Sequence, residues 1–255
     1  MRPRLMVVLS IAGVVVAALW WYSGSSLTAK ELAVMRAGFA GRWLLYTRDS
    51  LIETSRLHTL ATCGRHDAPY SWRLVLTGEH YESLDYVAAD PGKDWRSQLY
   101  IPNDTTENRA VFQVADTRKN SLSADLFVVL GEDSAYEQLF VDGETLGSVP
   151  GDCVLLMDAR FPGSHWMQPI EVQVGDCDRS LPPSAIEHGR VLFFCDGESW
   201  LLNSSVPDEA ICKFMTVSSA SRFSRDEELS KYLILRLKTG GRKLVDEEHL
   251  EWPQR

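Results

Sequence analysis

The chain of 255 residues lacks the short motifs that accompany much enzymatic chemistry. It has no Gly-x-Ser-x-Gly sequence to carry a nucleophilic serine, no glycine-rich phosphate loop and no Cys-x-x-Cys pair. Its six histidines are scattered without the spacing that zinc ligands show. We therefore expect no catalytic residue, no metal ion and no cofactor.

Clusters of basic residues are also absent beyond the first few positions. The whole chain has 26 Lys and Arg against 35 Asp and Glu, and removing Arg2 and Arg4 leaves 24 against 35, a net charge of −11. Nucleic-acid binding depends on clustered Lys and Arg that neutralise phosphates. The composition therefore excludes nucleic acid as a partner, while 45% hydrophobic residues exclude a disordered chain.

A long apolar run does exist, at residues 5–22, where sixteen of eighteen residues are apolar. Eighteen helical residues span about 27 Å, close to the hydrocarbon thickness of a bilayer, and aromatic residues at 20–22 suit its interface. The two leading arginines place the N-terminus in the cytoplasm. We expect a single-pass anchor whose body lies outside the cytoplasm, which would be the periplasm in a bacterium. The alternative is a signal peptide cleaved within the small residues 23–26.

A helix is expected from about residue 29 to 60. Thr28 and Glu31 have the spacing of a capping box. An apolar stripe then recurs at helical intervals, formed by Leu32, Met35, Phe39, Trp43 and Tyr46. Gly38 and Gly41 should weaken the middle of this helix. We expect the stripe to pack on its own domain, and a partner-binding face is the alternative.

The rest of the chain has the pattern of short strands and turns. Apolar runs bounded by Gly, Pro, Asn and Asp occupy residues 71–77, 110–115, 125–130, 138–141, 153–157 and 191–195. The run 191–195 is apolar at every position, which predicts a central strand buried on both faces. Asp-Gly pairs at 142–143 and 196–197 favour tight hairpin turns. A second capping box, Ser224 and Glu227, precedes a helical pattern that continues to Leu237.

Together these patterns predict an α+β protein with a transmembrane helix, an amphipathic helix, an antiparallel β-rich head and a short C-terminal helix. We divide the chain into an anchor at 1–24, a helical stalk at 25–62 and an extracytoplasmic head at 63–255.

Five cysteines lie in the exported part: Cys63, Cys153, Cys177, Cys195 and Cys212. The periplasm permits disulfides, and an odd number leaves at least one thiol unpaired within the chain. We consider Cys153–Cys177 and Cys195–Cys212 first because these residues are sequence neighbours. Buried free cysteines are the alternative.

Several stretches resemble, in order, the large family of pseudopilin-like proteins of planctomycete bacteria, whose C-terminal domain is named for a histidine, nine residues and an Asp-Gly pair. The similar stretches are 70–76, 90–95, 123–131, 153–158, 165–171, 188–197, 199–202, 226–233 and 239–241. The resemblance implies a type IV pilin-like head in the periplasm, held by a single pass through a bacterial inner membrane. The signature falls on His188, Asp196 and Gly197, with seven intervening residues in place of nine, and the chain has no prepilin leader.

The resemblance implies a non-enzymatic envelope protein with a structural, adhesive or secretion-associated role, able to associate with copies of itself or with other envelope proteins. We expect His188, Asp196 and Gly197 to be structural, and a cation site at Asp196 is the alternative. Two other functions remain open. One is a periplasmic small-ligand carrier built as a barrel or sandwich, and the other is an exported hydrolase using His165 or His188 with a Ser or Cys nucleophile.

Overall fold

The computed structural model describes residues 28–53, 55, 57–63, 71–73, 75–76, 112–114, 124–166 and 168–237. The expected span at 5–22 lies outside these residues, and so do Ala110, Val111 and Ala115 of the expected strand 110–115 and the Gly-Gly pair at 240–241. Residues 112–114 are described and do not form a strand. Within the described residues, none of the helices combines the length and the apolar character that a membrane crossing requires.

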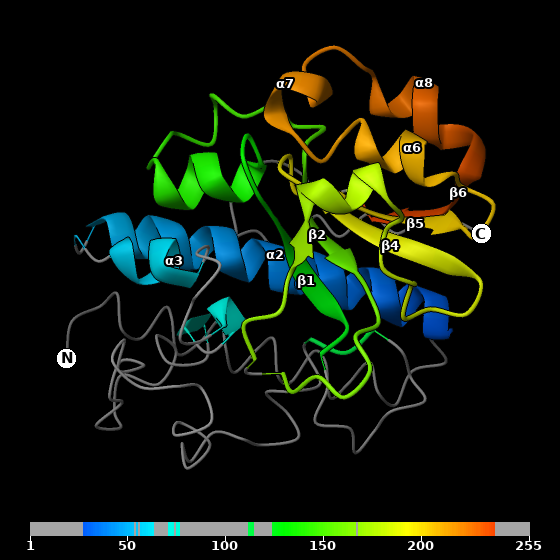
Figure 1. Cartoon of the computed structure of the whole chain (residues 1–255), viewed down its shortest axis with the longest axis horizontal. Coiled ribbons are helices and arrows are strands. Elements are labelled where there is room, and N and C mark those ends of the chain that lie inside the picture. The colour runs from blue at the N-terminus through cyan, green and yellow to red at the C-terminus, as the bar shows by residue number, and fades with distance from the viewer. Residues whose placement is uncertain are drawn as a thin grey trace.

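One six-stranded sheet forms the centre of the protein (Figure 1). Its strands, in chain order, are β1 Leu126–Leu130, β2 Val154–Asp158, β3 Val172–Gln173, β4 Gly189–Phe194, β5 Ser199–Asn203 and β6 Leu233–Leu237. Their order across the sheet is β3-β1-β2-β4-β5-β6. The expected α+β class is confirmed. The sheet is mixed rather than purely antiparallel, because β3 runs parallel to β1. The described strands form one open sheet, not the barrel or sandwich of the ligand-carrier alternative.

β4 is a central strand, as its sequence predicts. Every residue of β4 is buried, and the strand pairs with β2 on one side and with β5 on the other. The hairpin between β4 and β5 turns at Asp196 and Gly197, where Gly197 adopts a positive φ of 90°. The position of the turn predicted from this Asp-Gly pair is therefore confirmed, but Asp196 has no positive φ, so the expected type I′ geometry is not present.

The long helix α2, Ala29–Glu53, lies against β2, β4, β5 and β6 and crosses one face of the sheet (Figure 1). The predicted capping box begins it, since Thr28 N–H donates to Glu31 Oε2 at 2.8 Å and Glu31 N–H donates to Thr28 Oγ1 at 3.3 Å. Its last residue is Glu53, and a shorter helix α3, His58–Cys63, follows. The single helix expected over 29–60 is thus interrupted.

The two glycines of α2 lie where the helix approaches the sheet most closely. A Cβ on Gly41 would stand 2.2 Å from the Phe193 ring, and one on Gly38 would stand 2.8 Å from Ser199 Oγ. The buried face of α2 is accordingly built from small and aliphatic residues, among them Ala33, Ala37, Ala40 and Leu44. The predicted stripe packs on its own domain in part: Met35, Phe39 and Trp43 are half-buried and pack against the core, whereas Tyr46 is exposed. The fully buried face of α2 is the neighbouring one.

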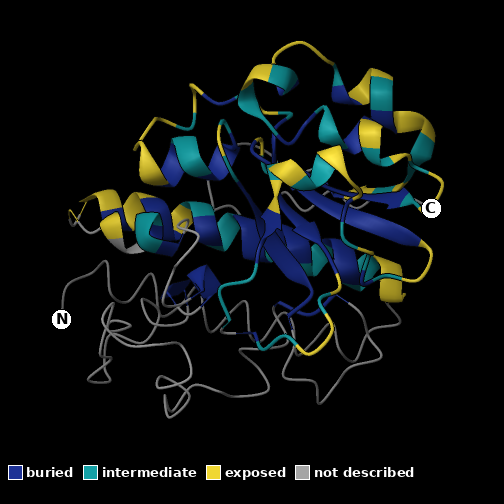
Figure 2. Cartoon of the chain, viewed as in Figure 1, coloured by how far each residue is buried: buried dark blue, intermediate teal, exposed yellow. Residues whose placement is uncertain are grey.

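Three short helices cover the other face of the sheet: α6 Asp208–Cys212, α7 Val217–Ala220 and α8 Arg225–Leu229. Phe193 and Ser199 are paired neighbours on β4 and β5 and face α2. Phe194 and Trp200 point the opposite way, and their rings meet Arg225 at the start of α8. Figure 2 shows the buried sheet between these partly exposed layers.

Four further local predictions were wrong. Residues 72–73 and 75–76 are helical rather than extended, and Glu137–Val141 is a π-helix, η3. Asp142 caps η3, so Asp142-Gly143 follows a helix and does not join two strands. The predicted closing helix ends early. After Ser224 caps α8 and the 3₁₀ turn Ser230–Tyr232, the chain becomes β6, in which Ile234 and Arg236 are exposed and Leu237 is buried. A run of leucines at alternating positions fits a strand as well as a helix.

Candidate functional site

The signature residues lie at opposite ends of β4. His188 immediately precedes the strand and is exposed, with its Nε2 3.7 Å from Glu187 Oε1. Asp196 and Gly197 follow the strand at its far end. An extended strand advances about 3.3 Å per residue, so the two ends are on the order of 20 Å apart. His188 and Asp196 therefore belong to different sites.

Hydrogen bonds within the hairpin turn hold Asp196 in place independently of its charged neighbours. Its N–H donates to Gly151 O at 3.1 Å, and its Oδ1 accepts the N–H of Glu198 at 2.9 Å. The Gly197 N–H donates to Phe194 O at 2.9 Å and closes the turn. The carboxylate is thus held on the α8 side of the sheet edge.

Arg225, the first residue of α8, brings three acidic side chains together at this turn. We call this group the Arg225 clamp, and it comprises Arg225, Asp152, Asp196, Glu198, Phe194 and Trp200. Its members come from the turn before β2, the end of β4, the start of β5 and the start of α8. It therefore joins four segments that are distant in sequence.

The clamp is a dense set of charge-assisted contacts. Arg225 donates to both oxygens of Asp196, from Nη1 at 3.2 Å and from Nη2 at 2.6 Å. Its Nε lies 3.4 Å from Asp152 Oδ1, and its backbone N–H donates to Asp152 Oδ2 at 3.1 Å. Glu198 Oε2 lies 3.4 Å from Nη2 and accepts the indole N–H of Trp200 at 2.8 Å. A bidentate Arg–carboxylate contact of this kind defines geometry as well as charge.

Two aromatic rings close the clamp from the sheet. The guanidinium carbon lies 4.4 Å from the centroid of the Phe194 ring and 4.7 Å from that of Trp200. Burial alone would lower the pKa of Arg225, but the hydrogen bonds and charge of Asp196, with Asp152 and Glu198, raise it above its ordinary value. The guanidinium of Arg225 is therefore always charged, and three carboxylates surround it.

This arrangement bears on the alternative of a cation site at Asp196. The carboxylates that could surround a metal ion already surround a built-in cation, Arg225. Over the described residues, no group of three or more His, Cys, Asp or Glu is arranged to hold a metal ion. A charged guanidinium supplies neither a nucleophile nor a base. The clamp can hold segments together, which agrees with the structural role expected of Asp196 and Gly197.

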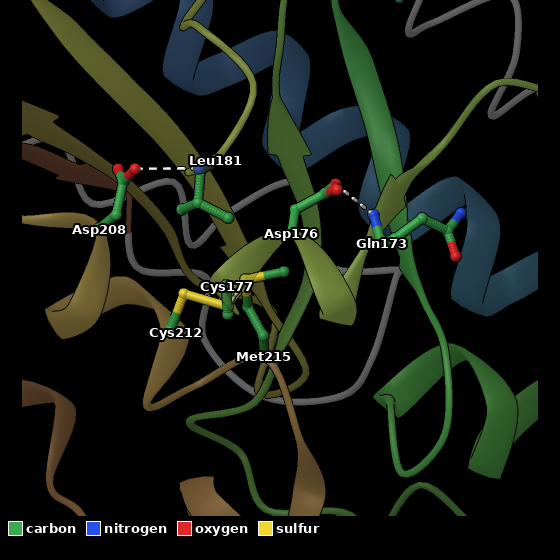
Figure 3. Close-up of a disulfide and its surroundings, with 7 residues drawn as sticks. All are labelled: Gln173, Asp176, Cys177, Leu181, Asp208, Cys212 and Met215. Carbon is green, nitrogen blue, oxygen red and sulfur yellow. Dashed lines mark hydrogen bonds between the residues drawn. A yellow bond between two sulfur atoms is a disulfide. The ribbon is translucent and has the colours of Figure 1, made fainter. Parts of the chain in front are cut away.

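The disulfide of the protein joins Cys177 to Cys212, with the two Cα atoms 5.8 Å apart (Figure 3). The expected pairs Cys153–Cys177 and Cys195–Cys212 were both wrong. Cys177 belongs to the 3₁₀ segment η4, Val174–Asp178, and Cys212 ends α6. The neighbouring bond from Leu181 N–H to Asp208 Oδ2, at 2.9 Å, joins the loop after η4 to α6, so tertiary proximity rather than sequence spacing set this pairing.

A second charged group lies in the interior near β1. The side chains of Arg73 and Glu171 are 0% and 2% exposed and are joined by hydrogen bonds of 2.9 and 3.3 Å. Arg73 also donates to Leu126 O from Nε at 3.1 Å and from Nη2 at 2.6 Å, while Glu171 Oε2 accepts the N–H of Val128 at 2.9 Å. We call these two residues the Arg73–Glu171 pair. It connects the segment around residue 73 to β1 and to the residue before β3.

Burial dominates the electrostatics of this pair. Burial raises the pKa of Glu171 to about 7, although Arg73 and the Val128 N–H act against the rise. Burial likewise lowers the pKa of Arg73, against the opposing charge of Glu171. The rings of Trp72 and Phe127 lie 5.0 and 4.6 Å from the guanidinium carbon. Perturbed carboxyl groups often mark active sites, but this one has no exposure to meet a substrate.

A third buried acid, Asp158, anchors the loop that leads into β4. Its Oδ2 accepts the hydroxyl of Ser184 and the N–H of Ala185, the latter at 2.8 Å, and its Oδ1 accepts the N–H of Val191 at 2.6 Å. Burial raises the pKa of Asp158, and Arg190 opposes that rise. The contacts are structural, because they fix Ser184, Ala185 and the β4 backbone at Val191 beside the last residue of β2.

Sequence reasoning missed Arg225, Arg73, Glu171 and Asp158. A signal existed for Arg73, which interrupts the apolar run 71–76 at a position where a strand core would not accept an isolated charge. Arg225 gave no such signal, since it occupies the first position of a helix beside several acidic residues.

Comparison with known proteins gives no further guide to the site. No protein-family model, no curated protein and no solved structure matches the chain.

Proposed function

We propose that this protein is a membrane-anchored, non-enzymatic envelope protein whose pilin-like head stands outside the cytoplasmic membrane in a structural or adhesive role. The observation that carries the proposal is helix α2, which follows the apolar run 5–22 and lies across four strands of the sheet. A long N-terminal helix packed on a mainly antiparallel sheet is the arrangement that the pseudopilin-like resemblance implies.

The packing of α2 suits a helix that transmits force from an anchor to a head. Its 25 residues span about 37 Å. Gly38 and Gly41 let its backbone approach the sheet so closely that any side chain there would collide with Ser199 or Phe193. Thr28 to Lys30, at its N-terminal end, are exposed. A force applied through the anchor would therefore pass into the sheet through the most tightly packed part of the helix.

The disulfide and the charge of the head support a place outside the cytoplasm. Cys177–Cys212 requires an oxidising compartment to persist in most organisms. The chain beyond its two leading arginines carries a net charge of −11, which anionic lipid headgroups repel. Such a head would stand off the membrane on α2.

The test begins with the location of the native protein. We expect it to sediment with membranes, to resist extraction by alkaline carbonate, and to become accessible to protease on the head when the outer membrane is opened. Leu9→Arg with Val15→Arg should release the protein from membranes, because each charge at the centre of a span costs about 2.5–3.5 kcal/mol. Leu9→Val with Val15→Leu is the matched control and should remain bound.

A mature N-terminus near residue 25 in a soluble fraction would overturn the anchor. For the structural role, chemical cross-linking of whole cells should join the head to copies of itself or to other envelope proteins. A head that stays uncross-linked at native abundance, while a known envelope complex in the same cells is captured, would overturn that role.

A further inference from the structure

Two of the free cysteines face each other on neighbouring strands. Val154 and Phe194 are directly opposed in the β2–β4 ladder, and the next opposed positions are Cys153 and Cys195. The Cys195 N–H donates to Cys153 O at 2.9 Å, so the two backbones stay paired for one residue beyond the strands. The next bond, from the Asp196 N–H to Gly151 O at 3.1 Å, belongs to the turns and leaves the register of the ladder. Side chains at opposed positions of an antiparallel pair share a face, which places the two thiols on the same face of the sheet.

The separation of such a pair is compatible with a disulfide. Opposed residues in an antiparallel ladder have Cα atoms about 5.5 Å apart when they are hydrogen-bonded and Cβ atoms about 4.5–5.5 Å apart. Disulfides join Cα atoms about 4.4–6.8 Å apart, with the Cβ atoms about 3.5–4.5 Å apart. Forming the disulfide would require the two Cβ atoms to approach each other by about 1 Å at most. The Cys153 N–H donates to Pro150 O and not to β4, so this approach breaks no bond of that N–H to the neighbouring strand.

We propose that Cys153 and Cys195 are a redox pair: the structure holds their dithiol state, and oxidation joins the two sulfur atoms across β2 and β4. The two thiols lose two protons and two electrons in forming the S–S bond. A disulfide oxidant, either a thiol oxidase or a small-molecule disulfide, accepts the electrons by thiol–disulfide exchange and becomes a dithiol or two thiols. The proposal does not depend on the membrane anchor.

The burial of both residues determines when the bond can form. Cys153 and Cys195 are 0% and 4% exposed, and burial raises the pKa of both thiols, that of Cys153 to about 12. Exchange needs a thiolate that an oxidant can reach. The bond must therefore form while the chain folds, as the hairpin pairs with β2 and before α8 closes over its end. The same burial would protect the finished bond from reductants.

The test is a map of the disulfides in the full-length protein in detergent. Protein unfolded and reduced is refolded in a mixture of oxidised and reduced glutathione, and free thiols are then alkylated in denaturant without reduction. Trypsin alone leaves Cys195 and Cys212 on one peptide, 191–213, so a second protease that cleaves after Glu198 is required. We expect a cross-linked species containing Cys153 and Cys195, and a fall from three alkylated thiols per chain to one, Cys63.

Matched variants separate this pair from the other disulfide. Cys153→Ser should leave Cys195 alkylated and Cys177–Cys212 intact, whereas the double variant Cys177→Ser, Cys212→Ser should keep the cross-strand bond. The same map of protein alkylated directly at lysis needs no refolding. Alkylated Cys153 and Cys195 beside an intact Cys177–Cys212 bond would overturn the proposal, as would linkage of either residue to another cysteine or to glutathione.

Discussion

Two arginines in this protein are held by the same kinds of neighbours at different depths. Arg225 and Arg73 each lie between two aromatic rings and each bind a carboxylate through two nitrogen atoms. Arg225 meets three acidic residues, two of which are about one-third exposed. Among the described residues, Arg73 binds the carboxylate of Glu171, and both side chains are buried. The pKa of Arg225 is raised, whereas that of Arg73 is lowered.

The difference shows how exposure to solvent determines the contribution of an ion pair to folding stability. Asp152 and Asp196, at a partly solvated turn, keep part of their hydration while they attract Arg225, so their charge favours the guanidinium. In the interior, one carboxylate cannot compensate for the water that both charges lose. The clamp should therefore contribute net stability, while the Arg73–Glu171 pair should mainly make its surroundings intolerant of change.

Breaking the buried pair should produce the largest effect. Arg73→Met keeps the length of the side chain but leaves Leu126 O without its two guanidinium donors and Glu171 without its partner. We expect a loss of about 3–5 kcal/mol in the free energy of unfolding, measured by urea denaturation. Arg222→Met, at an exposed position, is the control and should change stability by less than about 0.5 kcal/mol. A loss below about 1 kcal/mol for Arg73→Met would contradict the importance of the pair.

The free energy of unfolding should depend on pH because ionising Glu171 is unfavourable in the folded protein. Its pKa is about 7 in the folded protein against an ordinary value of 4.5, so the folded state holds the proton more tightly than the unfolded state. The resulting stability is fully present below pH 4.5 and is lost as the pH rises through about 7. The total change is on the order of 3 kcal/mol. Glu171→Gln should remove this slope from unfolding free energies measured between pH 4.5 and 7.5, and an unchanged slope would show that the carboxyl titrates normally.

Removing the cation of the clamp should cost less. Arg225→Ala deletes the bidentate bond to Asp196 and leaves three carboxylates facing one another. Hydrogen bonds to charged groups contribute about 1.5–3 kcal/mol each when buried, and partial hydration of Asp196 reduces that figure, so we expect a loss of about 2 kcal/mol at pH 7. Arg236→Ala is the matched control, because Arg236 is exposed and only approaches Asp226 at 3.9 Å. Equal losses for the two variants would refute a clamp.

The parts of the fold that local patterns determine could be predicted. An unbroken apolar run gave the central strand β4, an Asp-Gly pair gave its turn, and Ser224 gave the cap of α8. The face of α2 could not be read from its large apolar residues. Close approach to Phe193 and Ser199 selects small residues instead, and that demand is set by the sheet, not by the helix. Residues 233–237 become a strand because β5 offers them an edge to pair with.

The candidate site was predicted only in part, for a related reason. Asp196 and Gly197 could be located because a tight turn is a local event. Arg225, the partner of Asp196, lies 29 residues after it in sequence, and Asp152, which binds the same guanidinium, lies 44 residues before Asp196. The bond between Cys177 and Cys212 likewise depends on η4 meeting α6. Contacts made by tertiary packing leave no trace in local periodicity.

The finest test asks whether the clamp needs the shape of arginine or only its charge. Arg225→Lys keeps a cation at the start of α8, but an ammonium group cannot bind both oxygens of Asp196 in a plane or stack flat against Phe194 and Trp200. We expect a loss of about 1 kcal/mol in the free energy of unfolding, about half that of Arg225→Ala, because the attraction to Asp152 and Glu198 survives. Urea midpoints of the three proteins decide the matter. If lysine restores full stability, charge alone holds the clamp, and if lysine is no better than alanine, the bidentate geometry accounts for its entire contribution.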